Sequence, residues 1–132
     1  MKYFSIAELC RSSIAERRRI KNEPTKAIEQ NLESLVENVL DPLREAWGRP
    51  IIVNSGYRCA ELNKAVGGSP TSHHLWGMAA DITAGDTIAN IKLFNLVLKL
   101  GLPFTQLIDE QHYTWLHISY DANNLKKEVR HM

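Results

Sequence analysis

The stretch SHHLWGMAADIT (residues 72–83) decides the fold that we expect for this chain. It opens with polar residues and two adjacent histidines and ends in a short apolar run. On the two-residue period of a strand, Asp81 shares one face with Ala79, whereas Ile82 lies on the other face. Gly77 and the alanines are small, so the backbone can pass close to its neighbours. The stretch therefore predicts a loop that leads into a strand bearing a carboxylate.

Four further segments carry helical patterns. Ser5 followed by Glu8 is typical of a capping box at the start of a short helix. Pro42 lies inside the longest apolar stripe and should kink that helix or split it near Leu40. Asp86 or Thr87 is expected to cap a later amphipathic segment. The predicted helices cover about residues 5–9, 25–47, 59–68 and 86–101.

Short β-branched and apolar runs predict the strands. The run at residues 51–53 is expected to be a buried strand, and the residues QHY (111–113) fit a hairpin turn between two later strands. Helices that alternate first with single strands and then with a hairpin favour an α+β fold, a small and mostly antiparallel sheet with helices packed on it. The predicted strands cover residues 51–53, 78–83, 104–110 and 114–120.

Length and composition bound the organisation of the chain. Its 132 residues suit a single domain, 1–132, with N-terminal helices over about 5–47, a core over about 51–121 and a basic C-terminal tail, 122–132, expected to be mobile. A net charge of +1 does not favour a nucleic-acid partner, and no apolar run is long enough for membrane insertion. We expect a monomer.

The N-terminus and the cysteines indicate a cellular compartment. The first residues lack the pattern of a secretory signal, so we expect synthesis in the cytoplasm without a signal peptide. Cys10 and Cys59 are far apart in the sequence and form no CxxC motif, so free thiols are expected rather than a disulfide.

Histidines and one aspartate form the best candidate site. His117 lies between Leu116 and Ile118 in an apolar strand, where a half-buried, hydrogen-bonded histidine would be ordinary. A loop histidine and Asp81 could converge with it on one point and supply two imidazoles and one carboxylate. Zinc accepts that set and keeps a fourth position for water. The spacing alone leaves open which of the two adjacent loop histidines takes part.

The stretch SHHLWGMAAD fits the signature S-x-H-x-x-G-x-A-x-D, and the chain resembles the M15 family of zinc peptidases, the D-alanyl-D-alanine carboxypeptidase type. FSIAEL, VLDPLREAWGRPIIVNSGYRCAELNKAVGG, QLIDE and WLHISY resemble the small phage and bacterial branch of that family. The resemblance covers nearly the whole chain. It implies the zinc fold that these peptidases share with the hedgehog signalling domain.

The resemblance also implies roles for individual residues. Zn²⁺ would be bound by His74, Asp81 and His117, which leaves His73 at the rim of the site. Arg58 of the SGYR motif would hold the substrate by polarising the scissile carbonyl or gripping a carboxylate. The residues expected to contact substrate are Tyr57, Arg58, Ser72 and His73, although Ser72 could instead orient a ligand or cap the loop.

The general base departs from the family pattern. Many members carry an acidic residue three positions before the last histidine, where this chain has Thr114. Asp109 and Glu110 could replace it from the preceding strand, and strand alternation allows only one of them to face the site. The QLI-x-E pattern of the branch that the chain resembles favours Glu110 as the catalytic base. His112 could stabilise an oxyanion or could simply be an exposed turn residue.

These expectations lead to a functional prediction with one alternative. The chain is predicted to be a zinc-dependent metallopeptidase, a carboxypeptidase or an endopeptidase, that hydrolyses amide bonds of peptidoglycan stem peptides. It would act on the bacterial cell wall after release by lysis or in association with a phage. The alternative is a catalytically inactive zinc-binding module of the same fold that binds wall peptides or a protein partner.

Overall fold

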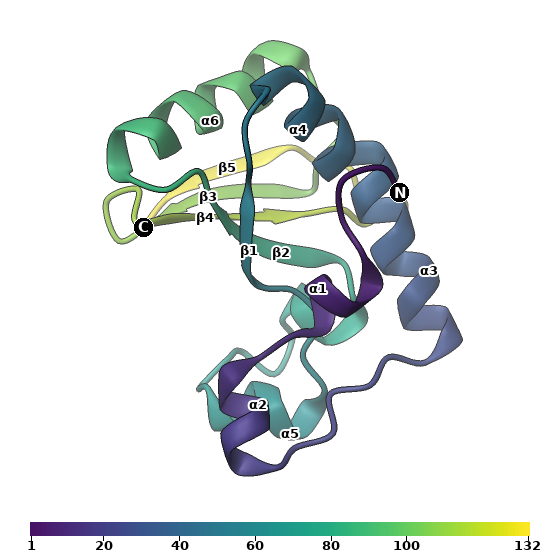
Figure 1. Ribbon diagram of the computed structural model, residues 1–132. Coiled ribbons are helices and arrows are strands. Elements are labelled where there is room, and N and C mark those ends of the chain that lie inside the picture. The colour runs from purple at the N-terminus through teal and green to yellow at the C-terminus, as the bar shows by residue number, and fades with distance from the viewer.

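A five-stranded sheet with strand order β1-β2-β4-β3-β5 organises the protein, in a computed structural model that describes residues 1–132 (Figure 1). Every neighbouring pair is antiparallel except β3 and β5, which are parallel. The sheet and its covering helices confirm the predicted α+β fold. The strands are β1 (Ile52–Ser55), β2 (Ala79–Thr83), β3 (Gln106–Glu110), β4 (Trp115–Ser119) and β5 (Glu128–His131).

The helices begin where the sequence supplies capping side chains. Ser5 accepts a hydrogen bond from the backbone N–H of Glu8, and Asp86 accepts one from that of Ala89. Helices α3, α4 and α6 lie beside the sheet, whereas α2 and α5 lie together away from it (Figure 1). The helices are α1 (Ile6–Cys10), α2 (Ser13–Arg18), α3 (Lys26–Leu35), α4 (Asp41–Trp47), α5 (Ala60–Ala65) and α6 (Thr87–Leu100).

The longest helical segment changes its winding just before Pro42. Residues Val36–Leu40 form a π turn between α3 and α4, and the N–H of Asp41 donates to the carbonyl of Val36. Proline has no N–H and its ring crowds the preceding turn, so a wider turn there keeps the chain helical on both sides. The interruption predicted near Leu40, a kink or a split, takes the form of a π turn, and the helical segment does not break there.

The two faces of the sheet have different tasks. One face carries apolar side chains that join the helices in one cluster of 21 buried residues. Ile82, Leu116 and Ile118 of the central strands are fully buried in this cluster. The other face carries Asp81 and His117, which are opposite each other in the β2–β4 register. The strand period of two therefore separates the core from the polar face.

Buried Asn90 of α6 holds the turn between β3 and β4. Its Nδ2 donates to the carbonyls of Tyr113 and Thr114 at 3.0 and 3.1 Å, and its Oδ1 accepts from the N–H of Ala84 at 2.7 Å. The turn residues Gln111–Tyr113 all have positive φ. The predicted hairpin is confirmed, and its geometry is tied to α6.

Three predictions of local structure need correction. Strand β1 is not buried: it forms an edge of the sheet, extends to Ser55 and exposes 56% of Ile52. The loop before β2 contains a 3₁₀ turn, His73–Trp76, which the Ser72 hydroxyl caps. The tail is not free either, because residues 128–131 pair with β3 as β5. A four-residue edge strand leaves too short a pattern to be recognised in the sequence.

Two further observations concern the cysteines and the helices. Cys10 and Cys59 are both free thiols, as predicted, and burial raises the pKa of the Cys10 thiol to about 11. No helix combines the length and the apolar character that crossing a membrane requires.

Gly77 provides a test of the packing beneath the site. It ends the 3₁₀ turn at a φ of +69°, and an added Cβ would lie 2.9 Å from both the Cγ2 and the carbonyl oxygen of Ile28. We predict that Gly77→Ala lowers the free energy of unfolding by about 2–5 kcal/mol, the sum of left-handed strain and overpacking. Urea unfolding measures this loss.

Gly67→Ala is the matched control. Gly67 has a φ of +73° but nothing lies within 4 Å of its added Cβ, so only the strain of about 1–2 kcal/mol applies. Equal losses for the two variants would show that the contact of Gly77 with α3 does not matter.

Candidate metal centre

His74, Asp81 and His117 converge on one point, and the three atoms that they offer a metal ion lie within 4.8 Å of one another. They come from the 3₁₀ turn, from β2 and from β4. The β2–β4 register places Asp81 directly opposite His117, and the tight bend at Gly77 returns the 3₁₀ turn toward the same point. Segments distant in sequence thus form a group that could hold a metal ion.

His74 is oriented by backbone contacts on both of its sides. Its Nδ1 lies 2.6 Å from the carbonyl oxygen of Gly56, which can only accept, so Nδ1 carries the proton. Its own carbonyl accepts from the N–H of Arg58 at 3.0 Å, and its N–H donates to the Ser72 hydroxyl at 3.1 Å. Only 2% of His74 is exposed. Because Nδ1 is engaged by the carbonyl of Gly56, Nε2 is the nitrogen of His74 that faces Asp81 and that could bind a metal ion.

One oxygen of Asp81 faces both imidazoles. Oδ1 lies 3.2 Å from Nε2 of His74 and 3.1 Å from Nδ1 of His117. Burial alone would raise the pKa of Asp81, but the contacts with His117 and His74 outweigh it and hold the pKa well below its ordinary value. The carboxylate is therefore ionised, as metal ligation requires.

The donor set fits zinc, and so do the two separations from Asp81 Oδ1. Nitrogen and oxygen ligands at about 2.0–2.1 Å from a tetrahedral ion lie about 3.3 Å from each other. The two contacts of Asp81 Oδ1, at 3.1 and 3.2 Å, are close to this separation. Two imidazoles and one carboxylate fill three positions, which leaves a fourth for a water molecule or substrate.

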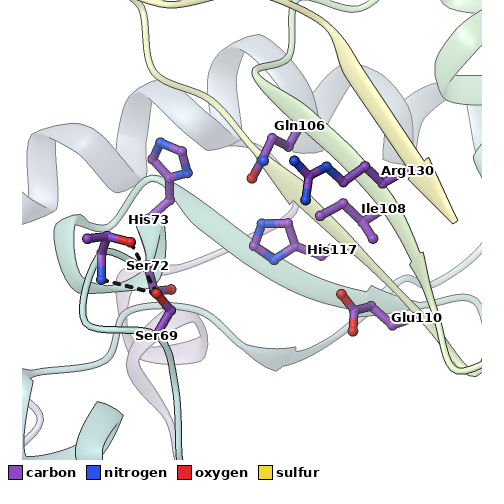
Figure 2. Close-up of a pocket in the computed structure, with 9 residues that line it drawn as sticks. Ser69, Ser72, His73, Gln106, Ile108, Glu110, His117 and Arg130 are labelled. Carbon is purple, nitrogen blue, oxygen red and sulfur yellow. Dashed lines mark hydrogen bonds between the residues drawn. The ribbon is translucent and has the colours of Figure 1, made fainter. Parts of the chain in front are cut away.

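A cavity of about 450 Å³ opens beside this group (Figure 2). Figure 2 shows His117 at its centre, with His73 and Glu110 on different sides of it. The structure thus brings four of the predicted site residues to one cavity. The lining residues are Ser69, Thr71, Ser72, His73, Gln106, Ile108, Glu110, His117 and Arg130.

The two acidic candidates on β3 lie on opposite faces. Glu110 follows Ile108, the β-partner of His117, by two residues and lines the cavity. Burial and the charge of Asp81 raise the pKa of Glu110. Asp109 points to the other face, is only 4% exposed and contacts His131. Of the two, only Glu110 lines the cavity.

Arg58 and Tyr57 lie behind the cavity rather than in its lining. The Nη2 of Arg58 donates to the Ser72 hydroxyl at 3.4 Å, and its buried Nε has no partner. Burial lowers the pKa of Arg58, and the nearby charge of Asp81 opposes that shift. Tyr57 is 9% exposed and belongs to the hydrophobic core. Both residues line a second cavity, on the side of α2.

The remaining candidates occupy the rim and the hairpin turn. His73 lines the cavity, and its pKa is lowered by burial and then by the neighbouring His117. His112 is exposed in the turn and lines no part of the cavity. Thr114 donates its hydroxyl hydrogen to the carbonyl of Gln111 and so stabilises the turn.

Sequence reasoning missed five of the nine residues that line the cavity, among them Gln106 and Arg130. Gln106 lies two residues before Ile108 on the same face of β3, so strand alternation could have identified it. Arg130 lies on β5, in the segment predicted to be a mobile tail. The alternation of Glu128, Val129 and Arg130 is the single signal that could have identified that strand.

Comparisons with known proteins connect the chain to a peptidase family. The family model described as Peptidase M15 matches residues 2–119. One relative, the zinc D-Ala-D-Ala carboxypeptidase of Streptomyces albus G, is 47% identical over 47 residues. These residues are 35% of this chain and only 18% of that protein, so the match spans less than a fifth of the relative's length. The chain belongs to the peptidase M15 family, and this membership together with the His–Asp–His group indicates zinc as its cofactor.

Proposed function

We propose that the protein is a zinc peptidase that hydrolyses amide bonds of peptidoglycan stem peptides, with His74, Asp81 and His117 as the zinc ligands. The observation that carries the proposal is the position of Glu110, which lies on the same sheet face as His117 and lines the same cavity. A metal site that holds only structure needs no carboxylate beside an open cavity. A hydrolytic site needs one, because a water proton must be removed and then returned to the leaving amine.

A zinc ion bound by the three ligands would acidify a water molecule and polarise the scissile carbonyl. Glu110 would accept the proton of the attacking water and deliver it to the leaving amine. Burial, the largest cause of the raised pKa of Glu110, suits this exchange, because a base whose pKa is nearer neutrality both takes and returns a proton readily. The chain itself thus supplies both the metal ligands and the proton carrier.

Arg58, Ser72 and His73 would then contact or position the substrate at the edge of the cavity. Ser72 and His73 line it directly, and the guanidinium of Arg58 reaches its wall through the Ser72 hydroxyl. Tyr57 would support Arg58 from the core. Arg58 therefore stabilises the developing oxyanion only if substrate binding draws its guanidinium toward the cavity.

The substrate class is inferred from the named relative. That protein is a D-Ala-D-Ala carboxypeptidase, and D-alanyl-D-alanine ends the uncrosslinked stem peptides of peptidoglycan. Small polar residues line the cavity together with charged ones, which suits a polar peptide better than a large apolar side chain. We propose that the protein acts on the cell wall, either by trimming a terminal residue or by cutting within the stem.

Digestion of purified stem peptides tests this function. We predict that mass analysis finds hydrolysed fragments with zinc-loaded protein, that a chelator stops their formation, and that added zinc restores it. Unchanged cleavage in chelator would contradict the metal mechanism. Intact peptides with a zinc-loaded protein would instead favour the alternative, an inactive zinc-binding module, which Thr114 at the family's acidic position permits.

Substitution of the proposed base separates catalysis from zinc binding. We predict that Glu110→Gln lowers kcat at least about 100-fold, the usual contribution of a general base, and leaves one zinc ion bound per chain. Asp109→Asn is the control, because its side chain faces the other side of the sheet. If Asp109→Asn instead removed activity from a folded protein while Glu110→Gln remained active, the base would be Asp109.

A further inference from the structure

The C-terminal strand adds a cationic side chain to the cavity. Arg130 of β5 lines it together with Gln106, Glu110 and His117. The parallel β3–β5 register places Arg130 beside Ile108, which pairs with His117 on the next strand. The family match ends at residue 119, so this arginine comes from outside the matched segment.

Strand β5 is firmly attached to β3. The N–H of Glu128 donates to the carbonyl of Thr105 at 2.9 Å, and that of Met132 to the carbonyl of Asp109 at 2.9 Å. The side chain of His131 contacts that of Asp109 at the end of the strand. Backbone bonds at both ends therefore fix the position from which Arg130 projects.

Glu128 orients the guanidinium of Arg130. Its Oε2 accepts from Nε of Arg130 at 2.6 Å, and its Oε1 accepts from Nε2 of Gln106 at 2.8 Å. The contacts with Gln106, Arg130 and Lys126 lower the pKa of Glu128 to about 2, so the anchor remains charged at neutral pH. Only Nε of Arg130 is engaged, which leaves the donors of both terminal nitrogens for a ligand.

The polarity of the cavity follows from this arrangement. Figure 2 shows the guanidinium of Arg130 near Gln106. Glu110 lies on the other side of His117. An anionic group would be repelled at the Glu110 end and attracted at the Arg130 end. A guanidinium offers paired donors that match the two oxygens of a carboxylate.

We propose that Arg130 is a specificity-determining residue that binds a carboxylate of the peptide substrate, beside the bond that is cut. The inference rests on the proposed peptidase function. The C-terminal carboxylate of the peptide and the side-chain carboxylate of a stem residue share this chemistry. The first source corresponds to a carboxypeptidase and the second to cleavage within the stem.

Binding of defined peptides tests the proposal independently of turnover. The first probe is diacetyl-L-Lys-D-Ala-D-Ala, whose single carboxylate is C-terminal, compared with its C-terminal amide. The second is the pentapeptide L-Ala-γ-D-Glu-L-Lys-D-Ala-D-Ala with its glutamyl carboxylate free or amidated. Calorimetry with zinc-loaded Glu110→Gln protein measures affinity without hydrolysis, so the result does not depend on whether the protein proves to be a peptidase.

We expect Arg130→Gln to weaken binding of the recognised free acid about tenfold and to leave binding of the matching amide unchanged, as loss of a partly exposed charged hydrogen bond predicts. Arg130→Lys should recover part of the affinity. With wild-type Glu110 present, KM for the free acid should rise while kcat changes little.

Lys126→Gln is the matched control. Lys126 also contacts Glu128, at 3.2 Å, but does not line the cavity. Lys126→Gln therefore removes the same single positive charge as Arg130→Gln, yet it should leave the affinities for the acid and for the amide unaltered. Thermal melting checks that β5 stays attached in each variant. Equal effects of Arg130→Gln on acid and amide, or no effect on either, would overturn the proposal. Wild-type protein that binds these peptides without cutting them would overturn only the peptidase function.

Discussion

One oxygen of Asp81 lies within 3.2 Å of a nitrogen of His74 and of a nitrogen of His117. The surrounding elements hold the three side chains in this contact. A buried carboxylate is costly unless it is paired. The antiparallel register of β2 and β4 brings His117 opposite Asp81, and the carbonyl of Gly56 sets the tautomer of His74. A shift of one residue in that register would turn Asp81 toward the apolar core.

Strand alternation explains how so small a protein builds both a core and a reactive site. Leu107 and Asp109 of β3 lie on the helix-covered side, whereas Ile108 and Glu110 lie on the side of His117. The side chain of Asp109 therefore contacts His131 and helps to hold β5 on the sheet, whereas Glu110 remains available to the cavity. Two adjacent carboxylates thus have different tasks, one in fixing a strand and one in the proposed chemistry.

The sequence predicted those features that depend on local chemistry and on the strand period. The caps at Ser5 and Asp86, the interruption before Pro42 and the alternation around Asp81 are local, and the structure has them all. The edge position of β1 and the attachment of β5 depend on pairing between distant segments, which no local pattern encodes. The same limit hid Arg130, because its place in the cavity requires the β3–β5 register.

Zinc content per chain after dialysis tests the central claim most directly, when wild-type protein is compared with His74→Gln and His73→Gln. The two histidines are neighbours in the chain, but only His74 faces Asp81 while His73 lies at the rim of the cavity. We predict one zinc ion per chain for wild-type protein and for His73→Gln, and none for His74→Gln. Retention of zinc by a folded His74→Gln variant, or its loss from His73→Gln, would contradict the account.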